Sequence, residues 1–225
     1  MLTDEEIKRM KFLLNLRESN YEKGLRNKEF SGQDLSKADL HGMQIVNVNF
    51  ENTNLDGTNL YDSQLINCKF NNATLRRAIM RKTSIFNCDF SGSILTQCDI
   101  SDSYLYDDIF KSADAHFIKM INSHIINLNF EECNLSNANI SGSRVSMSNF
   151  TGCNMQFINA DKSIIAGTNI SKTKLNYSSF NSAILHLVKL EDTETDNVVM
   201  LDAKVDNDVT KDGRIRNIDI KVLAP

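Results

Sequence analysis

The chain contains no tryptophan, and its single proline is Pro225. The ring of proline therefore interrupts backbone hydrogen bonding nowhere before the last residue. No apolar run approaches the length of about 18 residues that a transmembrane helix needs, and the opening MLTDEEIKRM is acidic where a secretory signal would be basic. A net charge of -4 does not predict the positively charged surface that binding to nucleic acid or anionic lipid requires. We therefore expect a cytoplasmic protein that binds neither nucleic acid nor membrane.

The chain repeats every fifth residue. In FENTNLDGTNLYDSQLINCKF, residues 50–70, a large apolar residue occupies every fifth position, whereas helices repeat near 3.6 residues and strands near 2. The same register holds from Phe30 to Leu190, where 33 consecutive fifth positions are apolar. We call this position the central slot. The residue two places before it is usually small, and the residue one place before it is often Asn or Asp.

A second period, four times as long, lies over the first. Phenylalanine fills one central slot in four, so residue n is expected to pack beside residue n+20 as structural core. The longer period holds four pentads, which predicts a coil with four sides whose successive turns pair as parallel strands about 4.8 Å apart. The phenylalanines of this column are Phe30, Phe50, Phe70, Phe90, Phe110, Phe130 and Phe150.

Glycine and asparagine recur two residues after the central slot. Both tolerate a positive φ, which the third residue of a type II turn requires. This position is therefore predicted to be the corner between two sides of the coil. The corner glycines are Gly32, Gly42, Gly57, Gly92, Gly142, Gly152 and Gly167.

The segments SKADL (36–40), NNATL (71–75) and LSNANIS (135–141) resemble the repeat of the pentapeptide-repeat family. That resemblance, over residues 30–190, implies an all-β solenoid, a right-handed quadrilateral β-helix of about eight coils. It also implies a bacterial protein, because the resemblance extends distantly to bacterial members that protect DNA gyrase from quinolones. The family fixes architecture better than function.

The two ends depart from the repeat. Thr3 and Glu6 form a capping-box pattern, and the apolar spacing that follows predicts a helix over 4–20 within an N-terminal helical cap, 1–29. After the β-helix at 30–190, the register stops at Thr195, and alternation over 197–205 and 214–223 around the turn KDG (211–213) predicts a C-terminal β cap, 191–225. A strand pair there closes the last coil or pairs edge to edge with a second copy, which makes a homodimer possible.

The reactive side chains favour structure over chemistry. Histidines share no column with the cysteines, so we expect no metal and no cofactor. Flat ladders lack the pocket that catalysis needs, and we expect no enzyme and no catalytic residue. Asp108 is the anomaly, because a carboxylate in a small inward position predicts a local distortion across 106–120, which reflects either compensated packing or a kink that marks a contact site. The cysteines, all in the small inward position, are Cys68, Cys88, Cys98, Cys133 and Cys153.

The most consistent function is a non-catalytic scaffold acting through protein–protein interaction with an unspecified partner. The alternative, implied by the family, is a DNA-mimicking protein that binds DNA gyrase or topoisomerase and gives resistance to quinolones or toxins. DNA mimicry requires an acidic rod, yet residues 30–190 carry 14 acidic and 13 basic residues. A secreted effector or a structural filament is a third class.

Two outward columns are candidate interaction surfaces. The first, which we call the stripe, is five apolar residues in succession, which predicts an exposed contact surface about 19 Å long or simple stacking along a sheet. It could receive a partner protein, a second copy of the chain or the N-terminal segment folded back. The stripe consists of Val46, Ile66, Phe86, Tyr106 and Ile126; the second, weaker patch is Phe117, Phe157 and Tyr177.

Overall fold

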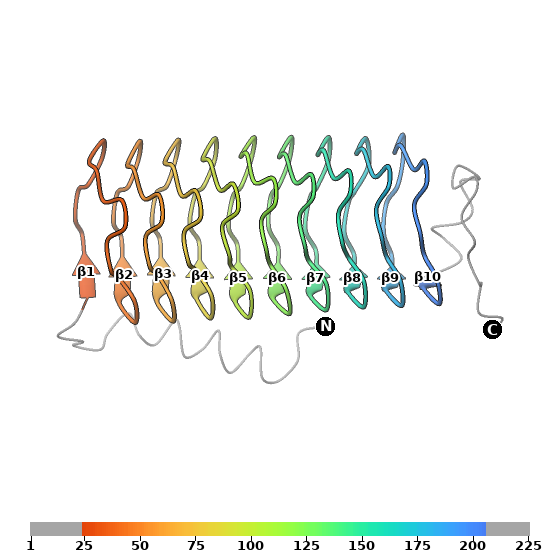
Figure 1. Cartoon of the computed structure of the whole chain (residues 1–225), viewed down its shortest axis with the longest axis horizontal. Helices are drawn as coiled ribbons and strands as arrows, with labels where there is room; N and C mark the ends of the chain where they lie inside the picture. Colours follow the sequence, from red (N-terminus) through yellow and green to blue (C-terminus); the bar gives the residue numbers. More distant parts are fainter. Residues whose placement is uncertain (1–23, 206–225) are drawn as a thin grey trace.

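The computed structural model describes residues 24–205, which wind into one β-solenoid of stacked, similar coils (Figure 1). One side of each coil is a short strand, and the ten strands form a single parallel sheet in chain order. Each strand pairs with the residues 20 positions along the chain, such as Leu65 with Ile85. The strands are β1 (Gly24–Arg26), β2 (Gln44–Val46), β3 (Gln64–Ile66), β4 (Ser84–Phe86), β5 (Tyr104–Tyr106), β6 (His124–Ile126), β7 (Arg144–Ser146), β8 (Ile164–Ala166), β9 (Ile184–His186) and β10 (Lys204–Val205).

The other three sides of each coil pair in the same register through single parallel bridges. Asn49 pairs with Lys69, and each later pentad repeats the arrangement. The amide of a central-slot residue donates to a carbonyl of the next coil, as from Phe50 N to the Lys69 oxygen at 2.7 Å. The predicted coil with four pentads per turn is confirmed.

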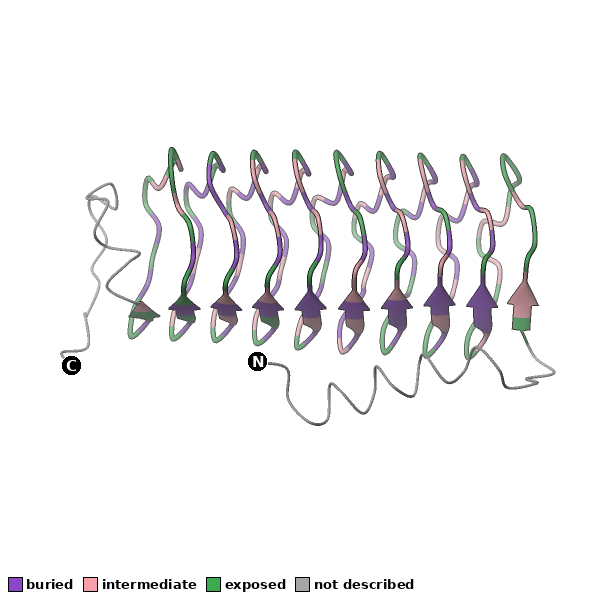
Figure 2. Ribbon diagram, turned by 180° about the vertical axis from the view of Figure 1, so that it is seen from behind, coloured by how far each residue is buried: buried purple, intermediate pink, exposed green. Residues whose placement is uncertain are grey.

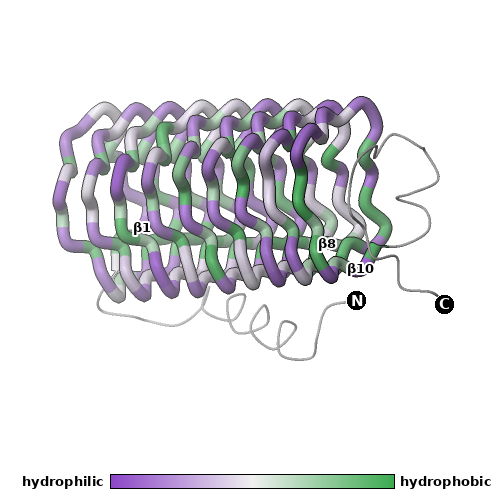
Figure 3. Tube along the Cα trace, turned by 45° about the vertical axis from the view of Figure 1, so that its right-hand side comes forward, coloured by the Kyte–Doolittle hydropathy of each residue, from purple (hydrophilic) through white to green (hydrophobic). Residues whose placement is uncertain are grey.

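The central slots fill the interior of the solenoid. The phenylalanine column forms a stack from Phe30 to Phe150, in which successive ring centroids lie 4.5–5.6 Å apart. Phe50 to Phe150 are buried, and Phe30 near the first coil is half-buried. Hydrophobic and hydrophilic positions consequently alternate along every coil (Figure 3). The prediction that this column is core agrees with its burial.

The corners follow the predicted turn chemistry. All seven corner glycines have positive φ, and so do the non-glycine corners, including Asn52 at 56°. The bond from Thr53 N to the Phe50 oxygen, 3.1 Å, closes the turn around Asn52. The Asn or Asp before the slot has its own role: Asn49 Oδ1 accepts the amide of Glu51 at 2.9 Å, so these side chains satisfy backbone donors at the turn.

The corner that follows each strand works differently. In the described coils this corner lacks the closing bond throughout, as do the corners before Thr83, Ser103 and Ser123, and a side chain of the next coil can accept the inward amide instead. Cys88 N donates to Asp108 Oδ1 at 2.8 Å, and Leu128 N donates to Ser148 Oγ at 3.1 Å. Asp108 therefore fits the regular coil by replacing a serine hydroxyl. The predicted distortion across 106–120 is wrong, because the strand and turns repeat there unchanged.

The coil extends beyond the expected range of 30–190. It is already paired at Gly24, and it continues to Val205, so that nine coil spacings separate β1 from β10. Residues 197–205 are corners and sides of this coil rather than one strand, because Val198 and Met200 point inward as a small and a large pentad member. Over so few residues that pattern is indistinguishable from strand alternation. The predicted helix 4–20 and strand 214–223 lie outside the described residues.

Candidate functional site

The stripe exists as a column, but it is not an open apolar surface. Register places its five members side by side on the outer face of β2–β6, and the rings of Phe86 and Tyr106 stack at 5.4 Å. Val46, Ile66 and Ile126 nevertheless expose only 7, 4 and 5% of their surface. The expectation of an exposed stripe is therefore wrong for these three residues, and Phe86 and Tyr106 are half-buried.

The weaker patch is the more accessible surface. Phe117, Phe157 and Tyr177 lie at corners of one column and expose 49, 51 and 55% of their surface. We call these three residues the aromatic corner. Phe157 and Tyr177 stack at 5.1 Å, whereas Asn137 separates them from Phe117 in the column. Large apolar area thus faces solvent at three corners of this column.

The backbone of the aromatic corner is unfavourable for the residues that it carries. Phe117, Phe157 and Tyr177 have φ of 58°, 60° and 63°, in the left-handed region that bulky side chains rarely adopt. Asn137 and Asn197 occupy equivalent corners with the residue type that, after glycine, tolerates this conformation best. Every described corner has a positive φ, and Met147 and Leu187 are as exposed as these residues, so the aromatic corner is distinguished by having three exposed aromatic side chains in one column.

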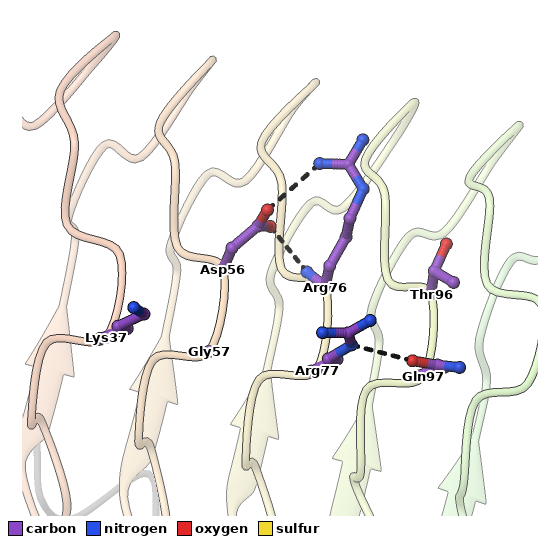
Figure 4. A pocket seen from close by; sticks show the side chains of 7 residues that line it. All are labelled: Lys37, Asp56, Gly57, Arg76, Arg77, Thr96 and Gln97. Carbon is purple, nitrogen blue, oxygen red and sulfur yellow. Dashed lines mark hydrogen bonds and ion pairs between the residues drawn. The ribbon is translucent and has the colours of Figure 1, made fainter.

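The same corner column is basic at its other end. A shallow pocket of about 470 Å³ lies over the early coils (Figure 4), with Arg76 Nη1 at 3.2 Å from Asp56 Oδ2 and Arg77 Nε donating to Gln97 Oε1 at 3.0 Å. Both arginines therefore have neutralising or polar partners. The pocket is lined by Lys37, Asp56, Gly57, Arg76, Arg77, Thr96 and Gln97.

The basic residues 76–82 do not form one site. Arg81 bonds Asp102 at 2.7 Å, and the Lys82 ammonium lies 5.4 Å from the centre of the Tyr61 ring, both one pentad beyond the pocket. Each pair uses its own corner of the coil. Arg76 and Arg81 are thus each paired with a carboxylate, Arg77 and Lys82 contact uncharged side chains, and the positive charge is spread over separate positions.

Two histidines have acidic partners that the sequence pattern did not reveal. His41 Nδ1 lies 2.8 Å from Asp39, and His116 Nδ1 lies 2.8 Å from Asp114. The sequence signal for these pairs is Asp-x-His, in which the middle residue is the central slot. The Asp and the His on either side of it both point outward and can therefore contact each other. Thr96 Oγ1 approaches the same Nδ1 atom of His116 at 3.4 Å. A Ser-His-Asp relay needs the acid and the nucleophile on opposite ring nitrogens, so this geometry does not form one.

The cysteines lie inward as the small members of their pentads. All five are buried and free, and burial raises the pKa of Cys153 to about 12. Within residues 24–205, no three His, Cys, Asp or Glu side chains converge as metal ligands. Thiols whose pKa burial raises are poor ligands and poor nucleophiles, and only Cys68 departs from this trend, because its hydrogen bond with Cys88 lowers its pKa. The contacts therefore agree with a packing role.

Asp108 is the one carboxyl in an inward column of the described coils. It exposes 1% of its surface, and its two oxygens accept amides from Cys88 at 2.8 Å and Tyr106 at 3.1 Å. Burial raises the pKa of this carboxyl well above its usual range, and the two amide donors offset the effect only in part. No other acidic or basic side chain is close enough to form an ion pair with it among the described residues. The Asp108 carboxyl therefore has a structural role as an acceptor for two backbone amides, and it is not part of a surface site.

Comparison with known proteins identifies the repeat. A family profile described as pentapeptide repeats matches eight copies, over residues 25–52, 44–81 and 118–156. Among the described residues, no helix has the length and apolar character of a membrane span. A search of curated proteins gave no significant match.

Solved structures share the fold at low sequence identity. HetL, a pentapeptide repeat protein involved in heterocyst differentiation regulation in the cyanobacterium Nostoc sp. strain PCC 7120, is 15% identical, with a TM-score of 0.61 over 90% of this chain and 94% of HetL. QnrB1, a plasmid-mediated fluoroquinolone resistance protein, is 18% identical, with a TM-score of 0.48 over 82% of this chain and 90% of that protein. At these identities, the first likeness concerns the fold alone, and the second carries no argument.

Proposed function

Since the chain belongs to the pentapeptide-repeat family, we propose that it is a non-catalytic scaffold that binds a partner protein through the aromatic corner. The observation that carries the proposal is the exposure of three aromatic side chains in one column, Phe117, Phe157 and Tyr177, of which the last two stack. Exposed apolar patches such as the stacked pair Phe157 and Tyr177 typically mark interfaces, and aromatic residues dominate the energetics of interfaces. The partner contributes an apolar surface that covers these rings.

The shape of the molecule supports a partner that lies along the coil axis. Phe117 and Tyr177 are three coil spacings apart, about 14 Å. Arg77 and Lys37 continue the same corner column in the earlier coils, where an acidic segment of the partner would find cations. A solenoid provides such extended surfaces because every coil repeats the same corner.

Substitution by asparagine tests the proposal without damaging the fold. Phe157→Asn combined with Tyr177→Asn removes the two stacked rings of the aromatic corner and introduces the residue that Asn137 and Asn197 already provide in this column. The matched control is Met147→Asn, a corner with φ of 53° and 55% exposure in a different column. All variants should fold with unchanged circular dichroism.

The readout is quantitative capture of proteins from a lysate of the source cell, followed by calorimetric titration of each captured protein. We expect the double variant to lose a partner that the wild type and Met147→Asn retain, with a loss of at least about tenfold in affinity, as for a hot-spot pair. Equal capture by all three proteins would reject the aromatic corner as the interface.

A further inference from the structure

The outer face of β2–β6 is more buried than an outer face of the coil should be. Of the described positions immediately before a central slot, only Gln44 and Ser84 are buried, and both belong to this face. Among the residues that directly follow a central slot, Val46, Ile66 and Ile126 of the same face are also buried. The burial of apolar side chains in outward positions is thus confined to this one sheet. Elsewhere the buried residues directly after a slot are polar, namely Ser101, Ser171 and Asn176.

The later strands of the same sheet provide an internal comparison. After the central slots of β7 and β8, Ser146 and Ala166 are half-buried although they are smaller than the stripe residues, and Arg144 and Ile184 before the slots of β7 and β9 are exposed. Figure 2 shows buried strands near β2 and more exposed colours toward β10. The backbone repeat and the strand pairing are the same in both halves. The backbone repeat alone therefore does not account for the difference, which is what additional chain over the early half of the sheet would produce.

We propose that residues 1–23 bind in cis along the outer face of β2–β6 and cover the stripe. This segment joins the sheet at Gly24 of β1, directly beside β2, whereas residues 206–225 leave from β10 at the opposite end. The covered strands are the ones nearest to the N-terminal junction. Connectivity thus favours the N-terminal segment over the C-terminal segment as the occupant.

Length and chemistry both suit this occupant. The stripe spans four coil spacings, about 19 Å, and a helix over the predicted range 4–20 would measure about 26 Å. Ile7, Met10 and Leu14 recur at the spacing that gives one apolar helix face, which matches an apolar column along the solenoid axis. The segment would bind as a lateral strap across β2–β6, instead of capping the open end of the first coil.

Such a strap gives the stripe a partner within its own chain. Its position also separates it from the proposed function, because the aromatic corner belongs to a corner column outside the ten-stranded sheet. The strap would hold the early coils together, and an external protein could reach the stripe only by displacing residues 1–23. The two proposals can therefore fail independently.

The absence of tryptophan makes a single-tryptophan reporter possible. Phe86→Trp places the indole within the stripe of the full-length chain, and Phe157→Trp places it at the aromatic corner as a control. Docking predicts that Trp emission at position 86 lies at a shorter wavelength than at position 157. Adding Met10→Asp and Leu14→Asp should shift the emission of Phe86→Trp to longer wavelength and leave that of Phe157→Trp unchanged. Lys8→Asp, a charge change in the same segment that keeps its apolar residues, should shift neither.

Concentration dependence and circular dichroism complete the test. The short-wavelength emission should persist on dilution, because docking in cis is unimolecular, and the spectrum of the β-solenoid should remain in every variant. If Met10→Asp with Leu14→Asp leaves the Trp emission of Phe86→Trp unchanged, the proposal is overturned. Either a different part of the chain then covers the stripe, or residues 1–23 cap the end of the first coil. A shift to longer wavelength on dilution of the unsubstituted segment would overturn it in favour of a second copy of the chain.

Discussion

At the scale of single residues, the phenylalanine stack has a measurable stability contribution. Phe90 is fully buried, and its ring centroid lies 4.5 Å from that of Phe70 and 4.7 Å from that of Phe110. Phe90→Ala should lower the free energy of unfolding by about 3–5 kcal/mol, because it removes the transfer free energy and leaves a cavity.

The matched control is Phe90→Leu, since Leu190 and Ile170 occupy the same column later in the chain. Leucine keeps most of the apolar volume, so Phe90→Leu should lower the free energy of unfolding by less than Phe90→Ala does. Chemical denaturation followed by circular dichroism measures both values. An equally small loss for Phe90→Ala would mean that the coil collapses around the missing ring.

Asp108 predicts a dependence of stability on pH. Burial raises the pKa of its carboxyl above the usual value of 3.8, so the unfolded chain ionises it at a lower pH than the folded chain does. At a pH below the pKa of the unfolded chain, the Asp108 carboxyl is neutral in both the folded and the unfolded state, and it does not reduce the free energy of unfolding. As pH rises above about 4, the unfolded state is favoured progressively, until the folded carboxyl also ionises.

Asp108→Ser should remove this loss of stability. Ser148 in the same column accepts the equivalent amide through its hydroxyl, so serine can replace the carboxyl without leaving Cys88 N unpaired. We expect the melting temperature at pH 7–8 to rise by at least about 2 °C, on the order of 1 kcal/mol, and the difference from wild type to shrink toward pH 4. A lower melting temperature for the variant at neutral pH would show that the two amide bonds outweigh the burial of the charge.

At the scale of one structural element, the corner after each strand combines backbone conformation with side-chain bonding. Asn67 has φ of 52°, donates to Asn47 Oδ1 at 3.1 Å and accepts from Asn87 at 2.9 Å. Asn67→Ala removes the ladder and puts a Cβ-bearing residue without a local polar group at positive φ, which costs about 1–2 kcal/mol for the conformation alone.

Glycine at the same position separates the two effects. Asn67→Gly also removes the ladder but has no penalty at positive φ, as Gly167 demonstrates in the same column. Its free energy of unfolding should therefore lie between those of the wild type and Asn67→Ala. Equal losses for the two variants would assign the stability to the side-chain ladder instead.

The sequence predicted the elements that depend on local repeats. The central slots, the Phe90 column and the positive-φ corners follow from spacing, because every coil imposes the same steric requirement on equivalent residues. The failures have nonlocal causes. Thr195 is half-buried in the last coils, where a core covered from one side tolerates a polar residue, so the register continues past it. The burial of Ile66 depends on what covers the sheet, which periodicity does not specify.

The candidate site was predictable in composition but not in accessibility. The columns of Tyr106 and Tyr177 are both apparent from the longer period of the sequence, yet only the second is an exposed surface. Asp108 appeared anomalous because sequence reasoning could not anticipate the unpaired amide that it accepts. The regular part of the fold is encoded locally, whereas the accessibility of each surface depends on chain beyond the repeat.

At the scale of the whole molecule, the charge distribution bears on DNA mimicry. A DNA mimic requires a continuous line of uncompensated carboxylates, but the acidic side chains of this rod are repeatedly neutralised one coil away. Ion pairs join Asp56 to Arg76 at 3.2 Å, Asp102 to Arg81 at 2.7 Å and Glu131 to Lys111 at 3.0 Å. Opposite charges about one coil spacing apart cancel within the Debye length of about 8 Å at physiological salt.

We therefore expect no protection of DNA gyrase by this protein. In a supercoiling assay with a fluoroquinolone, micromolar wild-type protein should leave the inhibition unchanged. The informative variant is Arg76→Gln combined with Arg81→Gln and Lys111→Gln, which releases three carboxylates in different columns while keeping a polar, uncharged side chain at each position. If charge pairing is what prevents mimicry, this variant should bind gyrase more tightly than the wild type at low salt and lose the gain as salt is raised. Clear protection by the wild type would instead show that surface shape is sufficient, and would make gyrase the partner to test at the aromatic corner.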